Sequence, residues 1–441
     1  MLLWCELAWL GDEDPPAGGV LIECDGERIW SVDHGVAQAP TGAEVLHGLV
    51  IPGIANAHSH AFQRALRGRT HATTGSFWTW RRQMYELAAR LDPDSMLAVT
   101  RACFAEMALA GVTLVGEFHY VHRAPDGVPY EDPNAMGEAV IVAASEAGVR
   151  LTLLDACYLH GGIDPDPVQR RFFDPGAEAW AARVEALSRG SLVRIGAAIH
   201  SMRAVHPESA AVVARWAESR SAPLHAHVSE QPAENEACRD VYGATPTALL
   251  HFDGALSERF TAIHATHITD EDIRLLAEAG ACCCLCPTTE RDLADGIGPA
   301  TRLRDAGCHL AIGSDSNAVI EPFEESRALE LDERLASGTR GLFTGPELLR
   351  AATAGGYESL GWSSGGVIRE GALADLAAID TDGVRLVGIP PDQLLDGAVF
   401  AGAAADVRDV IVAGEFVVRD RTHLKLDVAR ELAESIAAVT G

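Results

Sequence analysis

Eight apolar segments, separated by longer helix-like stretches, constrain the fold of this chain more than any other feature of its sequence. Each segment is almost continuously hydrophobic, as a strand buried on both faces of a parallel sheet must be. Eight such strands alternating with helices are typical of a (β/α)8 TIM barrel, an α/β fold. The segments are residues 49–56, 112–118, 150–157, 193–200, 223–228, 260–264, 281–286 and 309–313.

Shorter strand-like segments with turns occupy both ends of the chain. Residues 2–10 and 19–24 are largely apolar, and Asp25-Gly26 supplies a hairpin turn after them. Similar short apolar segments occur near the other end of the chain, at residues 372–379, 407–412 and 415–418. We therefore expect a small β-sandwich domain built from both termini, residues 1–50 plus 366–441 with a C-terminal helix, beside a barrel over residues 51–365.

Charge and cysteine content narrow the class of partner and the compartment. The chain has 63 acidic and 35 basic residues, a formal net charge of −28. Such a surface repels nucleic acid and anionic lipid, so we expect neither as a partner.

There is no apolar run of roughly 18 residues and no signal-peptide pattern. The few, scattered cysteines then predict reduced thiols and a cytoplasmic location. The cluster at residues 282–286 predicts a buried strand, because consecutive side chains there point to opposite faces.

Histidine and carboxylate residues stand at the ends of several predicted strands, where the active sites of such barrels lie. His58 and His60 follow the first strand, and their i, i+2 spacing puts both imidazoles on one side of an extended segment. The remaining candidates are His225 or His227 and then Glu230 at strand five, His264 at strand six and Asp315 at strand eight. Together these residues predict a site for one metal ion, Zn²⁺ or Fe²⁺.

The string IPGIANAHSH at residues 51–60 resembles the first-strand signature of the amidohydrolase superfamily. The histidines at strands five and six and the aspartate at strand eight match the same superfamily, and the resemblance covers essentially the whole chain. It implies that His58, His60, His227 and Asp315 bind the metal, with His225 as the alternative to His227. Lys425 is the only lysine, so the resemblance is to the mononuclear branch rather than to the carbamate-bridged binuclear one. We expect one Zn²⁺ per chain, with Fe²⁺ as the alternative.

Four further strings carry a closer resemblance, to the formimidoylglutamate deiminases of histidine degradation. They are AHSHAFQR at 57–64, FWTWR at 77–81, EFHY at 117–120 and CPTTE at 286–290. The resemblance implies that Glu230 protonates the imine, that Asp315 accepts a proton from water, and that His264 stabilises the water and the tetrahedral centre. It also implies a substrate-binding set of Gln63, Arg81, Tyr120, His200 and Arg203.

Arginines gather in a part of the chain that lacks acidic residues. Between Val45 and Tyr85 there is no Asp or Glu, whereas Arg64, Arg81 and Arg82 all lie there. A guanidinium binds a carboxylate through two hydrogen bonds, so this stretch suits a small anionic substrate despite the net charge. Alignment of the FWTWR string alone favours Arg81 over Arg82.

The expected reaction is the hydrolysis of N-formimino-L-glutamate to N-formyl-L-glutamate and ammonia. The alternative is deamination of a heterocycle such as guanine, which requires an apolar or aromatic slot in place of two arginines. We also expect a homodimer, as is common in barrels of this branch, and a lid over the site formed by residues 61–91.

Overall fold

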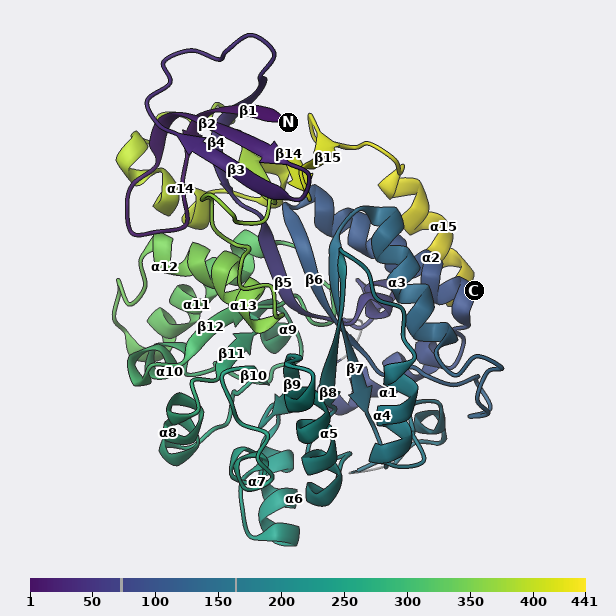
Figure 1. Ribbon diagram of the computed structural model, residues 1–441. Coiled ribbons are helices and arrows are strands. Elements are labelled where there is room, and N and C mark those ends of the chain that lie inside the picture. The colour runs from purple at the N-terminus through teal and green to yellow at the C-terminus, as the bar shows by residue number, and fades with distance from the viewer. Residues whose placement is uncertain (72–73, 163–164) are drawn as a thin grey trace.

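The computed structural model describes residues 1–71, 74–162 and 165–441, and a parallel sheet of eight strands forms its centre (Figure 1). The order of the strands in this sheet follows the chain. The sheet closes where Ser59 forms a parallel bridge with Asp315. This confirms the predicted barrel. The strands are β5 (Ile54–Ser59), β6 (Val112–His119), β7 (Arg150–Cys157), β8 (Val193–Ile199), β9 (Leu224–Val228), β10 (Phe260–His264), β11 (Cys282–Leu285) and β12 (His309–Ile312).

Helices connect these strands around the outside of the barrel (Figure 1). Their starts follow local rules: Asp92 caps α2 by accepting a hydrogen bond from the Ser95 amide at 2.8 Å, and Pro93 occupies the first turn. The helices are α1 (Phe77–Ala88), α2 (Pro93–Leu109), α3 (Ala135–Ala147), α4 (Ala177–Glu185), α5 (Pro207–Ser219), α6 (Pro232–Tyr242), α7 (Pro246–Phe252), α8 (Asp270–Glu278), α9 (Pro287–Asp292), α10 (Ala300–Ala306), α11 (Pro322–Ser337), α12 (Gly345–Arg350) and α13 (Gly356–Ser359).

The predicted first strand, residues 49–56, is wrong in its extent. β4 (Glu44–Pro52) ends and β5 begins on either side of Gly53, and β4 pairs with β1 and β13 outside the barrel. Gly53 packs so closely on β6 that a Cβ atom would lie 2.2 Å from the Thr113 hydroxyl. An uninterrupted apolar run therefore contains a change of sheet, which hydrophobicity alone does not reveal.

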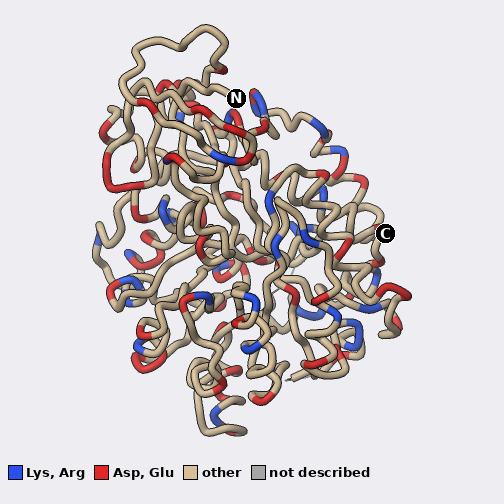
Figure 2. Tube along the Cα trace, in the orientation of Figure 1, with Lys and Arg blue, Asp and Glu red and all other residues tan. Residues whose placement is uncertain are grey.

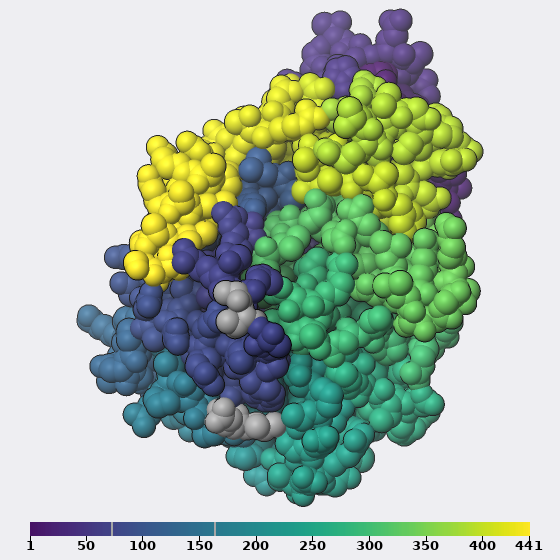
Figure 3. Space-filling model, turned by 180° about the vertical axis from the view of Figure 1, so that it is seen from behind, coloured from purple at the N-terminus to yellow at the C-terminus, as the bar shows by residue number. Residues whose placement is uncertain are grey.

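Strands from the first 52 and from the later residues of the chain form one mixed sheet of eight strands and lie side by side in Figure 1. Helix α14 (Leu394–Phe400) connects two of its strands, and α15 (Val428–Thr440) packs along α2 on the barrel (Figures 1 and 3). The predicted β-structure from both termini is confirmed, and the exact division into domains stays a prediction. The strands, in sheet order, are β16 (Thr422–His423), β15 (Glu415–Arg419), β14 (Val407–Val412), β13 (Leu376–Ile379), β4, β1 (Leu2–Ala8), β2 (Ala17–Asp25) and β3 (Arg28–Asp33).

Acidic residues occur in both the terminal sheet and the barrel (Figure 2). All ten cysteines are buried free thiols, and those at residues 282–284 lie in β11 as predicted. Among the described residues, no helix has the length and apolar character needed to cross a membrane. The expected homodimer and location stay predictions.

A buried ion pair joins the barrel to the terminal sheet. Arg150 begins β7 and Asp375 precedes β13, and neither side chain is exposed to solvent. Arg150 Nε donates to Asp375 Oδ2 at 2.7 Å, and the Tyr357 hydroxyl donates to the same oxygen at 2.8 Å. The Ala413 amide donates to Asp375 Oδ1 at 2.7 Å. Asp375 thus connects three segments that are distant in sequence.

We expect Asp375→Ala to lower the free energy of unfolding by about 3 kcal/mol, because it leaves the Arg150 charge buried without its main partner. Urea denaturation followed by circular dichroism measures the change. Asp382→Ala is the control, because Asp382 is exposed, and it should change stability by less than about 0.5 kcal/mol. A loss below about 1 kcal/mol for Asp375→Ala would show that the ion pair does not hold the two parts together.

Candidate active site

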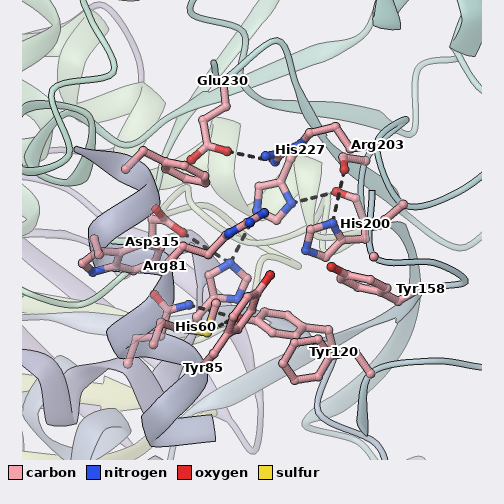
Figure 4. Close-up of a pocket in the computed structure, with 18 residues that line it drawn as sticks. His60, Arg81, Tyr85, Tyr120, Tyr158, His200, Arg203, His227, Glu230 and Asp315 are labelled. Carbon is pink, nitrogen blue, oxygen red and sulfur yellow. Dashed lines mark hydrogen bonds and ion pairs between the residues drawn. The ribbon is translucent and has the colours of Figure 1, made fainter. Parts of the chain in front are cut away.

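A cavity opens at the carboxyl ends of the barrel strands, and ten of its side chains are labelled in Figure 4. Among the predicted metal ligands, His60, His227 and Asp315 line it, and His58 is fully buried beside them. The cavity also contains Glu230 and all five predicted substrate-binding residues. Residues 72 and 73 of the predicted lid lie outside the described part of the chain, but α1 of the same segment forms one wall.

Asp315 is positioned by the junction at which the barrel closes, between β5 and the turn after β12, which we call the seam. The Asp315 amide donates to the His58 carbonyl at 3.0 Å, and the His60 amide donates to the Asp315 carbonyl at 2.8 Å. Gly313 permits this approach, because a Cβ atom there would lie 2.7 Å from the Cβ of His58. Asp315 itself has a φ of 44°, a conformation that costs of order 1 kcal/mol in a non-glycine residue. The surrounding seam holds it there.

Three imidazoles and one carboxylate converge at this seam. His227 Nε2 lies 3.2 Å from His58 Nε2 and 3.4 Å from His60 Nε2. Asp315 Oδ1 lies 3.0 Å from His58 Nε2 and 3.3 Å from His60 Nε2. Each of the four groups therefore directs one ligand atom toward a common point and could hold a metal ion.

Two of the imidazoles have a defined tautomer. His60 Nδ1 donates to the Phe118 carbonyl and His227 Nδ1 donates to the His200 carbonyl, both at 2.8 Å. Burial lowers the pKa of both rings, so both are neutral at physiological pH. The proton is on Nδ1, and the Nε2 lone pairs of the two rings face each other.

These residues fit a metal ion. Facing lone pairs and a carboxylate repel one another unless a cation lies between them, and His58 Nδ1 is buried without a hydrogen-bond partner. Ligand atoms bonded at ~2.0–2.1 Å to a tetrahedral zinc ion are roughly 3.3 Å apart. The observed separations of 3.0–3.4 Å agree with this value. Burial would raise the pKa of Asp315, but its hydrogen bond with His58 lowers it overall, so Asp315 is ionised.

His225, the alternative ligand at strand five, lies away from this cluster. Its Nε2 donates to the Ser359 carbonyl at 2.9 Å, and it is not among the four converging groups. Two other groups of potential ligands occur in the described chain. One, at His119, His122 and Asp155, already contains a cation, because Arg183 donates to Asp155 at 2.8 Å. In the other, at His264, Cys286 and Glu290, the Glu290 Oε1 atom already accepts hydrogen bonds from His264 Nδ1 and the Cys286 amide.

Glu230 and His264 lie beside the four converging groups. The His264 ring stacks on His227, and its Nε2 is 3.8 Å from Glu230 Oε1. Its Nδ1 donates to Glu290 Oε1 at 3.2 Å. Burial would lower the pKa of His264, but the Glu230 carboxylate and the Glu290 hydrogen bond raise it to about 10. His264 is therefore a cation that donates to Glu290 from Nδ1 and forms a longer ion pair with Glu230 through Nε2. Burial raises the pKa of Glu230.

The predicted substrate-binding residues come from four different segments. Gln63 donates to the Tyr120 hydroxyl at 2.9 Å, and the His200 ring packs against Tyr158 with centroids 4.3 Å apart. Arg81 extends from α1 into the cavity, its guanidinium 4.5 Å from the Trp78 ring centroid. Arg82, the alternative, is exposed and does not line the cavity.

Sequence reasoning missed much of the cavity wall. The side chains it missed are mostly aromatic: Phe77, Trp80, Tyr85, Tyr158 and Phe172. It also missed Glu290, which binds His264 although it lies in the CPTTE string. Glu290 lies in the CPTTE string and Phe77 and Trp80 lie in the FWTWR string, so the family resemblance was a usable signal for these three residues. Tyr85, Tyr158 and Phe172 lie in none of the quoted strings and had no such signal.

Several known proteins resemble this chain in sequence, in fold or in both. The amidohydrolase family model matches residues 49–417. Formimidoylglutamate deiminase of Pseudomonas aeruginosa is 40% identical over 398 residues, 87% of each chain. The 8-oxoguanine deaminase of the same organism is 30% identical over 96% of this chain and 94% of that protein. The crystal structure of an amidohydrolase from Brucella melitensis is similar with a TM-score of 0.92 and 35% identity over the whole of both chains. The chain therefore belongs to the amidohydrolase family and is a hydrolase related to deaminases.

Proposed function

We propose that this protein hydrolyses N-formimino-L-glutamate to N-formyl-L-glutamate and ammonia. One Zn²⁺ ion would be held by His58, His60, His227 and Asp315. The observation that carries the proposal is that the guanidiniums of Arg81 and Arg203 share one cavity with three of these ligands. Two arginines suit the two carboxylates of this substrate. The 40% identity to a formimidoylglutamate deiminase supports the same substrate.

The buried residues supply the proton transfers that the reaction needs. When bound, Zn²⁺ lowers the pKa of water toward ~7 and supplies hydroxide at neutral pH. Asp315 is ionised and accepts the proton that the attacking water loses. Glu230, with its raised pKa, binds a proton and donates it to the imine nitrogen. As the C–N bond breaks, Glu230 takes the hydroxyl proton of the tetrahedral centre and passes it to the leaving ammonia, and Asp315 releases its own proton to solvent. His264 is cationic and stabilises negative charge that develops on the attacked carbon's oxygen.

A heterocyclic substrate is the second candidate, because aromatic rings form much of the cavity wall and an 8-oxoguanine deaminase is a relative. A flat neutral ring offers no carboxylate to the guanidiniums of Arg81 and Arg203, both of which line the cavity. Ammonia release from N-formimino-L-glutamate by the zinc-loaded protein tests the proposal, with guanine and N-formiminoglycine as controls. Turnover of the glutamate derivative alone is expected. Preference for guanine would overturn the substrate assignment.

Metal content tests the ligand set without any assay of activity. We expect His227→Gln to lose zinc, because it removes an Nε2 atom from the converging group. His225→Gln is the matched control two residues earlier on β9, and it should retain about one zinc per chain. Inductively coupled plasma mass spectrometry of the dialysed variants measures both. Zinc retained by the His227 variant and lost from the His225 variant would reverse the assignment.

Glu230→Gln should retain zinc and fold normally, yet its kcat should fall by about 10²–10⁴-fold, because the amide cannot donate a carboxyl proton. Glu236→Gln is the control, since Glu236 is exposed on the same helix, α6, that follows Glu230. Steady-state ammonia release gives kcat for each variant. A kcat close to that of the wild type in Glu230→Gln would remove Glu230 from the mechanism.

Arg81→Met should reduce kcat/KM for N-formimino-L-glutamate by about 10²-fold, because it removes the partner of a desolvated carboxylate. Arg82→Met, one residue along α1 and exposed, should leave kcat/KM within about twofold of the wild type. The same ammonia assay compares the two. Equal losses in both variants would indicate a general effect on α1 rather than a contact with the substrate.

A further inference from the structure

The proposed catalytic acid is bound by the proposed carboxylate receptor. Arg203 Nη2 donates to Glu230 Oε2 at 3.2 Å, and this contact lies within the cavity (Figure 4). The Arg203 side chain is 10% exposed and that of Glu230 is 7% exposed, so water screens the ion pair little. Arg203 and Glu230, which are both proposed to contact the substrate, are thus hydrogen-bonded to each other in its absence.

A second buried carboxylate, that of Glu234, lies beside the Arg203 guanidinium. Glu234, in the first turn of α6, is fully buried, and its Oε1 lies 3.8 Å from Arg203 Nε. The Arg203 Nε and both Glu234 oxygens form no hydrogen bonds. The Phe77 ring of α1 lies on the guanidinium at 5.7 Å. Arg203 therefore keeps a buried partner in Glu234 when its contact with Glu230 breaks.

We propose that a substrate carboxylate replaces Glu230 on Arg203, and that this exchange releases Glu230 to act on the imine. The inference rests on the function and roles proposed above. It differs from simple anchoring, because the carboxylate would then be needed for the chemical step and not for binding alone. Charge favours the exchange: one carboxylate on the guanidinium is replaced by another, so the arginine is never left unpaired.

The consequence is selection against neutral amidines. A formamidine lacking a carboxylate can enter the cavity, but it cannot separate Glu230 from Arg203. Oε2 then stays bound to the guanidinium, and one of the two oxygens of the acid is withheld from the substrate. The contact between the substrate carboxylate and Arg203 lies away from the reacting imine, yet it would raise kcat because it frees Glu230 for the chemical step. Binding energy from a non-reacting part of a substrate can raise kcat in this way.

The substrate can be supplied in two pieces to test this exchange. Formamidine provides the reacting group, and glutarate provides the two carboxylates. With the zinc-loaded wild-type protein, glutarate should raise kcat for formamidine by about tenfold or more, a fraction of what a general acid contributes. Sodium chloride at equal ionic strength should not. If glutarate only competes with formamidine or has no effect on kcat, the exchange does not occur.

The variant Arg203→Met gives the complementary result. It should hydrolyse formamidine faster than the wild type does without glutarate, and it should no longer respond to glutarate. Its kcat/KM for N-formimino-L-glutamate should fall. Arg215→Met, an exposed arginine on α5, is the matched control and should behave as the wild type. Equal formamidine rates in Arg203→Met and wild type would reduce Arg203 to an anchor.

The two proposals can fail separately in these assays. If wild-type protein does not hydrolyse N-formimino-L-glutamate, the proposed function is wrong. If it does, but formamidine turnover is unaffected by glutarate and by Arg203→Met, only the exchange is wrong. The glutarate titration uses wild-type protein, so it decides the question even if Arg203→Met fails to fold.

Discussion

The seam between β5 and the turn after β12 is the constraint on which the rest of the site depends. Two backbone hydrogen bonds join His58, His60 and Asp315 there, at 2.8 and 3.0 Å. The same bonds complete the barrel and bring residues from opposite ends of its sequence into contact. Because the seam is part of the backbone, the positions of the imidazoles and the carboxylate follow from barrel closure. Rigid placement of this kind is what metal binding requires.

Positively charged side chains line the cavity although the chain as a whole is strongly acidic. A net charge of −28 disfavours the approach of any anion, yet Arg81 and Arg203 line the cavity and a cationic His264 stacks on His227 beside it. Glu230, Glu234 and Glu290 are buried around two of these cations. The site therefore presents paired charges, and a substrate carboxylate has to compete with a resident one. That competition is where selectivity for anionic amidines would arise.

Much of this arrangement was predictable from the sequence, for identifiable reasons. Buried parallel strands have an unmistakable apolar pattern, and polar residues at their ends have to face one opening. The break at Gly53 was not predictable, because both flanking segments are apolar and only the packing on Thr113 separates them. Glu234 was missed for a different reason. An acidic residue in the first turn of a helix normally faces solvent, and only the tertiary position of Arg203 explains its burial.

A crystal structure of the zinc-loaded protein with N-formyl-L-glutamate would test the account most directly. It should show anomalous scattering from one zinc among His58, His60, His227 and Asp315, with the two product carboxylates on Arg81 and Arg203. Glu230 should be separated from Arg203 in that complex. A product whose carboxylates lie away from both arginines, or a metal bound elsewhere, would contradict the central claim.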